Sequence, residues 1–333
     1  MNQIFKVVFN AARGKKMVVN EATSSVQKGK MAAVTVAVAG ALMLGANTAG
    51  AKAIGGEDLS GTVTEDPIGL DEVLSVDVNK GTIDEVISGH YFGINKYTTY
   101  LHEKEKAFKI QSTTTNVSGD VTVEEGVFGG SKFSGGFRDN NTECWKSSVT
   151  LKTSSTNLTI DGGKFGTFAY NPDPEAADCP LCEPAMRRVV TAADFVKDRG
   201  INYAGPVVIN TSVTDANLTI NGGEFYSTVY GGSVLSAYGY DNVNLSSTVE
   251  KSNVTITGGT FNAPVFAGGA AMNFHENTPN TPHEGSQITS IVKEANLVIQ
   301  NVKLTQGLYT GGLEGYLRDK KNCGSQCHSA RRC

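Results

Sequence analysis

The chain has 333 residues, of which 39% are hydrophobic and 19% charged, and its formal net charge is −4. This balance excludes a wholly disordered protein, and the length suits one large domain or two ordinary ones. Glycine is over-represented, with 38 residues against 9 prolines, and it lacks the every-third-residue period of collagen. Many tight backbone turns would explain this glycine content.

The net charge is divided unevenly along the chain. Residues 1–51 carry six basic side chains against Glu21 alone, a formal charge of +5, which leaves −9 for residues 52–333. A mildly acidic body argues against non-specific binding to nucleic acid or to an anionic membrane, because it offers no cations to replace their counterions.

An uncharged apolar run, Met31 to Ala46, follows the basic stretch and is succeeded by small residues. The run is short for a helix that spans a bilayer, and the sequence Ala49-Gly50-Ala51 suits signal peptidase. We predict a signal peptide that is cleaved after Ala51, with Ala53 as the next candidate. A retained membrane anchor is the alternative.

The stretch before the apolar run is unusually long for a basic n-region. It reads MNQIFKVVFNAARGKKMVVNEATSS and resembles the extended signal peptide region of type V secreted proteins of Gram-negative bacteria. The resemblance rests on Met1, Asn2, Ile4, Phe5, Lys6, Val7, Val8, Asn10, Arg13, Gly14, Val18, Val19 and Glu21. It implies export across the inner membrane to the cell surface, with inner-membrane secretion machinery and an outer-membrane β-barrel translocator as partners.

Six segments of the body share one pattern and start at Ser75, Asp120, Asn157, Asn217, Asn253 and Asn296. Apolar residues at the second and fourth positions predict a strand with one buried face. A glycine pair follows in three segments and predicts a turn through positive φ. An apolar residue comes next, and five residues later an aromatic position holds Phe133, Tyr170, Tyr230, Phe266 or Tyr309.

The segments keep their length while the spacing between them varies, which indicates a fixed unit with variable loops. A β-rich run precedes several segments, as in residues 147–153 and 207–213, so we expect three short strands per repeat. The predicted fold is all-β, a right-handed parallel β-helix whose coils stack like positions on like positions. The alternative is an antiparallel β-sandwich or prism made of hairpins.

Stacking would turn the repeated positions into ladders. We expect the Leu, Val, Ile and Phe columns in the interior. At a corner, side-chain amides would form an asparagine ladder of Asn157, Asn217, Asn253 and Asn296.

We expect five parts along the chain. Residues 1–25 form the extended signal peptide region, and residues 26–51 form the signal peptide core with its cleavage site. Residues 52–74 form an N-terminal linker or cap, residues 75–316 the β-helical repeats, and residues 317–333 a truncated cysteine-rich tail.

The longest insertion, from Asn171 to about Pro206, contains two cysteines and a candidate amphipathic helix at residues 191–198. Cys179 and Cys182 could form a redox pair or half of a zinc site, but a small local disulfide suits an exported protein better. The same interpretation applies to Cys323 and Cys327. No metal site and no cofactor is expected.

Several catalytic signatures are missing from the sequence, which has neither Gly-Asp-Ser-Gly nor Gly-x-Ser-x-Gly. Asp161 and Glu224 lie near corresponding coil positions, but Lys164 and Thr260 occupy equivalent neighbouring positions, so no acidic cleft is implied. We therefore predict a surface-displayed adhesin or adhesin-like stalk and not an enzyme. The alternatives are a β-helical polysaccharide lyase or glycoside hydrolase and a passive structural spacer.

The aromatic row is the candidate ligand site for a host or glycan ligand. Tyr170, Tyr230, Phe266 and Tyr309 could bind sugar rings by apolar contact if they face outward. Large aromatic side chains are usually mostly buried, so packing in the core or under a loop is the favoured interpretation.

Overall fold

A computed structural model describes residues 5–10, 15–20, 51–58, 72–94, 105–135, 147–166, 188–198, 207–238, 243–274 and 287–317. These residues form strands and turns, and within these ranges no helix is present that could span a membrane. The chain divides into two units, Met1–Thr35 and Val36–Cys333. In the first unit, β1 (Phe5–Asn10) and β2 (Lys15–Asn20) form an antiparallel hairpin.

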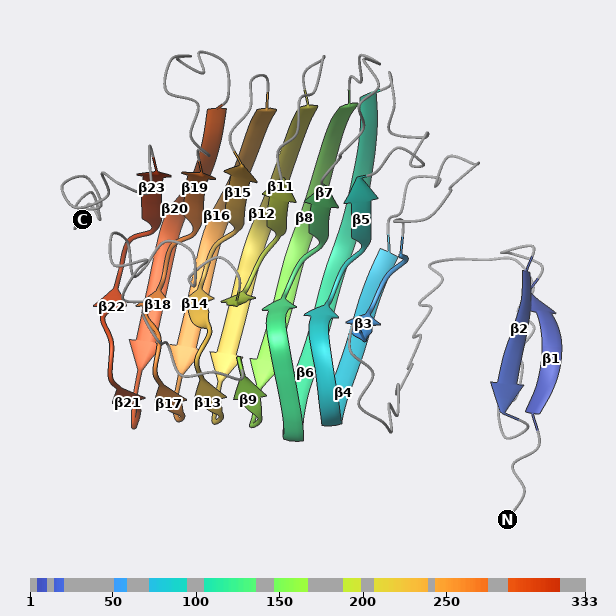
Figure 1. The fold of residues 1–333 in the computed structure, drawn as a ribbon, viewed down its shortest axis with the longest axis horizontal. Helices are drawn as coiled ribbons and strands as arrows, with labels where there is room; N and C mark the ends of the chain where they lie inside the picture. Colours follow the sequence, from blue (N-terminus) through green and yellow to red (C-terminus); the bar gives the residue numbers. More distant parts are fainter. Residues whose placement is uncertain are drawn as a thin grey trace. The chain divides into compact units, whose positions relative to one another are not determined.

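The second unit is a stack of coils in which equivalent strands lie side by side (Figure 1). A long strand opens each coil: β4 (Glu72–Ile87), β6 (Glu105–Phe128), β8 (Ser147–Ile160), β12 (Val207–Ile220), β16 (Val243–Ile256) and β20 (Gln287–Ile299). The last strand of each coil belongs to a second sheet: β5 (Tyr91–Ile94), β7 (Lys132–Gly135), β11 (Phe195–Asp198), β15 (Val234–Tyr238), β19 (Ala270–Phe274) and β23 (Leu313–Leu317).

Two short strands separate the long strand from the last one in the four later coils. The first set comprises β9 (Lys164–Phe165), β13 (Glu224–Phe225), β17 (Thr260–Phe261) and β21 (Lys303–Leu304). The second set comprises β10 (Val189–Thr191), β14 (Thr228–Tyr230), β18 (Val265–Phe266) and β22 (Leu308–Tyr309). In the first two coils β4 and β6 run on through these positions, and β3 (Lys52–Ile54) pairs with the end of β4.

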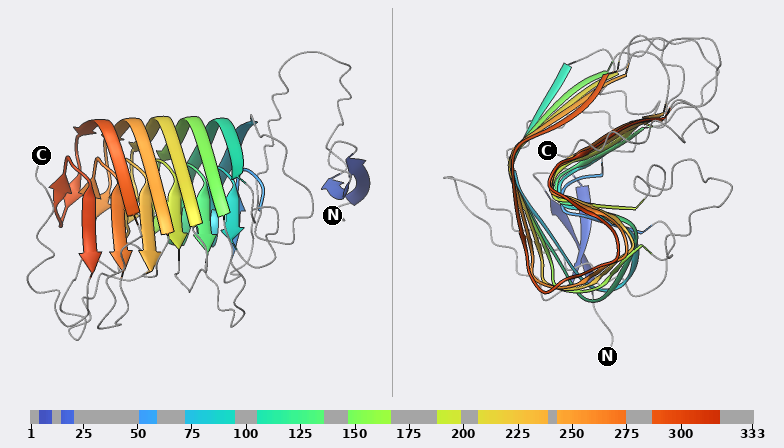
Figure 2. Two further views of the ribbon diagram at one scale, coloured as in Figure 1. Left: turned by 90° about the horizontal axis from the view of Figure 1, so that it is seen from above. Right: turned by 90° about the vertical axis from the view of Figure 1, so that its left-hand side faces the viewer.

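Every strand pair of the second unit is parallel, as in β8, β12 and β16, where Asn157, Asn217 and Asn253 are in register. This topology confirms the parallel β-helix, and the antiparallel sandwich or prism is wrong. Viewed along the stack, the coils superpose and each long strand bends between two arms (Figure 2). The runs at residues 147–153 and 207–213 are the first arms of β8 and β12. Each of the four later coils therefore has one long and three short strands, and not three short strands alone.

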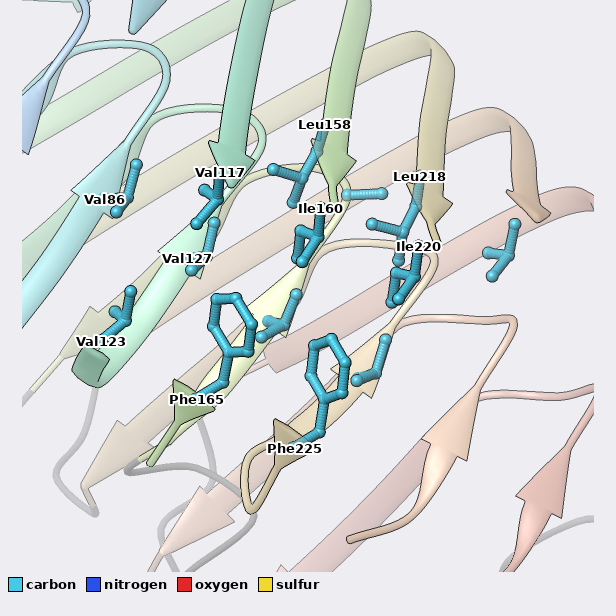
Figure 3. Packing of buried hydrophobic residues seen from close by; sticks show 14 of the residues in the cluster. Val86, Val117, Val123, Val127, Leu158, Ile160, Phe165, Leu218, Ile220 and Phe225 are labelled. Carbon is cyan, nitrogen blue, oxygen red and sulfur yellow. The ribbon is translucent and has the colours of Figure 1, made fainter. Parts of the chain in front are cut away.

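The second arms of the long strands enclose the main core, as the alternation predicted. Leu158 and Ile160 stack on Leu218 and Ile220 of the next coil, and all four are buried (Figure 3). The phenylalanine column lies against them, with ring centroids 4.7 Å apart for Phe165–Phe225 and 4.6 Å for Phe225–Phe261. Offset or stacked rings add to the burial of apolar area.

The first arms of the long strands pack against the second sheet and form a separate core. It contains Phe92, Phe133, Leu151, Val196, Ile209, Leu235 and Leu245. Hydroxyl groups lie between the two cores and bind the turns opposite. Thr156 Oγ1 donates to the Ala192 carbonyl at 2.6 Å, and Ser252 Oγ donates to the Ala267 carbonyl at 3.0 Å.

The two glycine positions of the repeat serve different purposes. Gly163, Gly223 and Gly259, each the second glycine of its pair, have φ values of 103°, 111° and 109°, as the sequence predicted. At the later step the requirement is space, because a Cβ on Gly231 would lie 2.3 Å from the Ala267 carbonyl oxygen and 2.4 Å from Ser252 Oγ.

The structure corrects the alignment of one repeat. Thr114, not Asp120, is in register with Asn157. Val121 and Val123 show the same alternation as Thr115 and Val117, and a period of two cannot distinguish these registers. Phe133 is consequently not in the aromatic row, because it pairs with Val196 in the second sheet.

The helix expected at residues 191–198 is also wrong. Thr191 belongs to β10 and residues 195–198 form β11, and each strand pairs with neighbours on both sides. Hydrogen bonding and packing in the stack override the local amphipathic pattern. Part of the predicted insertion is therefore the second half of a coil.

Candidate functional site

The aromatic row lies on β14, β18 and β22, just before the chain enters the second sheet, a region we call the aromatic corner. Ring centroids are 5.2 Å apart for Tyr230–Phe266 and 4.7 Å for Phe266–Tyr309. The bend folds the second sheet back toward this row, so Val234, Ala270 and the half-buried Leu313 pack against the rings. The corner forms a third apolar cluster outside the two cores.

The hypothesis that these aromatics face a ligand is wrong for two of the four. Tyr230 is 0% exposed and Phe266 is 3% exposed. Tyr309 is half-buried and packs against Phe266. Burial raises the pKa of the Tyr230 hydroxyl far above its ordinary value. Tyr170 lies outside the described residues.

Other predicted site residues also lie outside the described ranges. These are Ala49 and the cysteines Cys179, Cys182, Cys323 and Cys327. Ala51 is described, half-buried, and its carbonyl oxygen accepts a hydrogen bond from the Asp84 N–H at 2.9 Å. Glu224 stands between Lys164 and Thr260 in one column, as expected from the repeat.

Four charged residues gather beside the aromatic corner at its N-terminal end, and we call them the ion cluster: Lys52, Glu85, Glu125 and Lys132. Lys132 Nζ donates to Glu85 Oε1, and the two side chains are 9% and 3% exposed. Lys52 Nζ lies 3.9 Å from Glu85 Oε2 and 3.9 Å from the centre of the Tyr91 ring. Strands β3, β4, β6 and β7 each supply one member.

Burial and like charge shape the electrostatics of the cluster. The pKa of Glu125 is raised, first by burial and then by the negative charge of Glu85, with which it shares a hydrogen bond. Removing Lys132 would leave a buried carboxylate without its partner, which is strongly destabilising. The two carboxyl groups touch, whereas a glycosidase pair stands about 5 Å or more apart to accommodate the sugar.

Sequence reasoning missed the ion cluster because both buried charges occupy positions that hold apolar residues elsewhere. Lys132 is in register with Tyr91 and Phe195, and Glu85 is in register with Gly126. The signal that could have found them is a pair of opposite charges facing each other in adjacent coils. That signal appears only when the second coil is aligned from Thr114.

A second buried polar row runs through the turns that lead into the second sheet. The backbone N–H of Glu57 donates to His90 Nδ1 at 3.0 Å, that of His90 to Ser131 Oγ at 3.0 Å, and that of Ser131 to Asp194 Oδ1 at 2.8 Å. Each side chain thus caps the turn of the preceding coil. Burial lowers the pKa of His90 to about 4 and raises the pKa of Asp194 to about 7.

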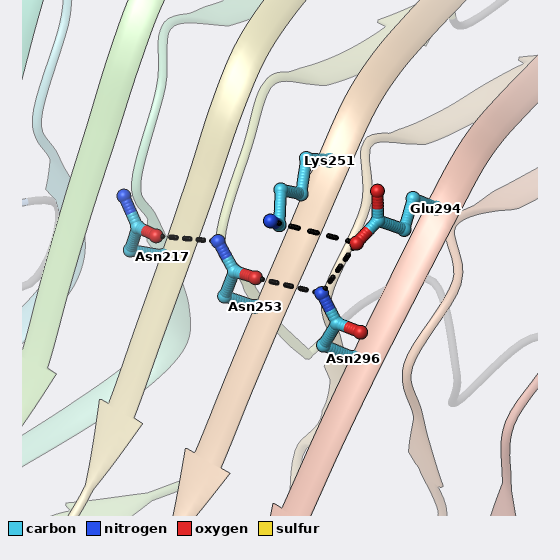
Figure 4. Close-up of polar contacts among 5 residues, drawn as sticks. All are labelled: Asn217, Lys251, Asn253, Glu294 and Asn296. Carbon is cyan, nitrogen blue, oxygen red and sulfur yellow. Dashed lines mark hydrogen bonds and ion pairs between the residues drawn. The ribbon is translucent and has the colours of Figure 1, made fainter.

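The outward side of the second arms carries polar ladders, and we call this surface the outer ladder face. Asn217 Nδ2 donates to Asn157 Oδ1 at 3.1 Å. Asn253 Nδ2 donates to Asn217 Oδ1 at 2.9 Å, and Asn296 Nδ2 donates to Asn253 Oδ1 at 3.1 Å (Figure 4). These bonds confirm the predicted asparagine ladder. Lys251 Nζ and Glu294 Oε1 form an exposed pair 3.5 Å apart beside it.

A threonine row lies next to the asparagine ladder on the same face. Thr159, Thr219 and Thr255 are in register on three adjacent strands and are half-buried. Neighbouring strands are about 4.8 Å apart, so hydroxyl and methyl groups repeat at that interval. The outer ladder face can therefore offer hydrogen-bonding groups and small apolar groups at a regular spacing.

Comparison with known protein families gives a match at the N-terminus. Residues 1–50 match the family model described as Extended Signal Peptide of Type V secretion system. The leader is an extended signal peptide of the type V secretion system. Neither a curated protein nor a solved structure matches the chain.

The type V leader establishes the export route of the protein. It directs the chain across the inner membrane to the cell surface or extracellular space, and it implies the Sec machinery and an outer-membrane translocator as partners. The parallel β-helix is consistent with an autotransporter passenger. Among the described residues no group of three His, Cys, Asp or Glu side chains is placed to hold a metal ion.

Proposed function

We propose that this autotransporter passenger is an adhesin-like stalk and that its outer ladder face binds a host surface or glycan. The observation that carries the proposal is the uninterrupted register of Asn157, Asn217 and Asn253 with Thr159, Thr219 and Thr255. A regular array can make the same weak contact many times with a repetitive polar ligand. The total affinity then exceeds that of any single contact.

The stacked coils support this role because they hold the array rigid. The side chains behind the face, among them Leu158, Leu218 and Val254, are each 1% exposed and belong to the main core. The asparagine ladder also fixes the amides in one orientation. Little side-chain entropy would be lost when a ligand binds such a preorganised surface.

Glycan-array binding of the exported chain, purified after processing, tests the proposal. The variant Thr219→Glu places a charge in the middle of the threonine row, and we expect it to lower binding at least tenfold. The matched control is Lys303→Glu, which changes an exposed residue of β21 outside the face.

Thermal unfolding of all three proteins separates lost binding from lost folding. Equal glycan binding by the wild type and a folded Thr219→Glu variant would contradict the assignment to the outer ladder face. A wild type that binds neither glycans nor host cells would contradict the adhesin function itself.

A further inference from the structure

The N-terminal edge of the coil stack includes the first residues after the leader. β3 pairs with the end of β4, with Lys52 in register with Glu85 and Ala53 with Val86. Ala53 is 2% exposed and belongs to the main core. Cleavage after Ala53 would remove most of β3, so the geometry favours cleavage after Ala51, which leaves the strand intact.

One buried carboxylate oxygen of the ion cluster lacks a hydrogen-bond partner. Glu85 and Glu125 contribute two carboxyl groups, and the negative charge of Glu85 raises the pKa of Glu125 after burial, with a smaller effect of the neighbouring Asp84. Lys52 and Lys132 contribute two ammonium groups. Glu85 Oε2 is buried, has no hydrogen-bond partner, and lies 3.9 Å from Lys52 Nζ.

We propose that processing of the leader completes the ion cluster. Hydrolysis adds water across the peptide bond between Ala51 and Lys52, which leaves a carboxylate on Ala51 and an α-ammonium group on Lys52. Because Lys52 is in register with Glu85, the new ammonium is formed on the residue that pairs with Glu85, whose Oε2 lacks a hydrogen-bond partner. The proposal rests on export and on cleavage after Ala51.

Cleavage would also remove backbone hydrogen bonds at the same edge. The Ala51 carbonyl oxygen accepts hydrogen bonds from the N–H groups of Asp84 at 2.9 Å and Glu85 at 3.4 Å, and these would be lost. The new charges favour separation, because the Ala51 carboxylate is repelled by Asp84 and Glu85 while the ammonium is attracted. The leader is thus released and the mature end is retained.

The experiment measures the α-amine of the processed protein. The full chain is expressed in a Gram-negative host with a type V translocator, the exported form is recovered, and its first residue is identified by mass spectrometry. Competitive acetylation at several pH values then gives the pKa of the Lys52 α-amine. Glu85→Gln is compared with wild type, and Glu124→Gln is the matched control.

We expect the exported chain to begin at Lys52, with an α-amine pKa about one unit above the ordinary range of about 7.7–8.0. Below that range the amine would be acetylated about tenfold more slowly than in Glu85→Gln, and Glu124→Gln would behave as wild type. In urea all three proteins should react alike. Glu125→Gln gives a second test if Glu85→Gln does not fold.

Each outcome bears on a different step. A leader that remains attached inside the cell would overturn export of this chain. A processed chain that begins at another residue would overturn the cleavage site and the inference together. A chain that begins at Lys52, with the same α-amine pKa in the wild type and both glutamine variants, would overturn the ion pairing alone.

Discussion

At the scale of single residues, side chains accept hydrogen bonds from turn N–H groups in place of a regular backbone partner. The three side chains are those of His90, Ser131 and Asp194. They occupy the same position in successive coils, and each accepts a backbone N–H of the coil before it. His90 must accept at Nδ1, so its neutral form carries the proton on Nε2. Capping therefore requires a neutral histidine, and burial favours that form.

Asp194 and His90 make opposite contributions to the pH dependence of stability. The folded pKa of Asp194 is about 7, above its ordinary 3.8, so its stabilisation is complete below pH 3.8 and is lost as the pH rises to about 7. The folded pKa of His90 is about 4, below its ordinary 6.5, so its stabilisation is lost as the pH falls from 6.5 to about 4.

Asp194→Asn should therefore raise the free energy of unfolding at pH 8. A shift of about three units corresponds to about 4 kcal/mol, and we expect a gain of about 2 kcal/mol because the new amide N–H groups are buried without partners. Urea unfolding at pH values from 4 to 8 measures the change. The Asn oxygen still accepts the Ser131 N–H, so the cap is preserved.

Urea unfolding over the same pH range also distinguishes the contribution of His90 from that of Asp194. In Asp194→Asn the opposing slope of His90 remains, so stability should rise with pH between 4 and 6.5. A variant that is less stable than the wild type at pH 8, or that shows no slope in this window, would contradict the assigned pKa shifts.

At the scale of elements, the turn between the third and last strands sets the shape of each coil. It approaches the long strand so closely that Gly231 has no room for a side chain, and Ser252 on that strand hydrogen-bonds the equivalent turn of the next coil. Ala192 replaces the glycine in the third coil. The space available for a side chain at this turn position therefore differs from coil to coil.

Gly231→Ala should destabilise the protein by about 2–3 kcal/mol, because the new methyl group would overlap with backbone oxygen and with Ser252 Oγ. Gly162→Ala is the matched control. A Cβ at Gly162 would meet the Gly119 carbonyl oxygen at 3.4 Å, and its φ is not positive, so little change is expected. Thermal unfolding compares the two, and equal melting temperatures would refute the close approach.

At the scale of the molecule, the parallel β-helix and the asparagine ladder were predictable because the pattern of the repeat unit indicates both. Alternation marks the buried columns, and identical residues at identical positions must stack. The register of the second coil was not predictable, because Val121–Val123 and Thr115–Val117 alternate alike. Only the pairing with both neighbours decides between them.

The candidate site was harder to predict for the same reason. An aromatic row can face ligand or core, and the outcome depends on the bend that brings Val234 and Ala270 over Tyr230. The ion cluster and the His90–Asp194 row combine residues from different coils that share no sequence motif. Their partners are adjacent only after the coils have stacked.

The central claim is that this chain is exported and displayed as a folded β-helical stalk. The most direct measurement is the fraction of the chain that added protease can reach on intact Gram-negative cells that also carry a type V translocator. We predict that added protease reaches the chain on intact cells, while the strands of the coil stack within residues 72–317 survive as a resistant core. A chain that is digested only after the cells are broken, or that is degraded completely on intact cells, would contradict the account.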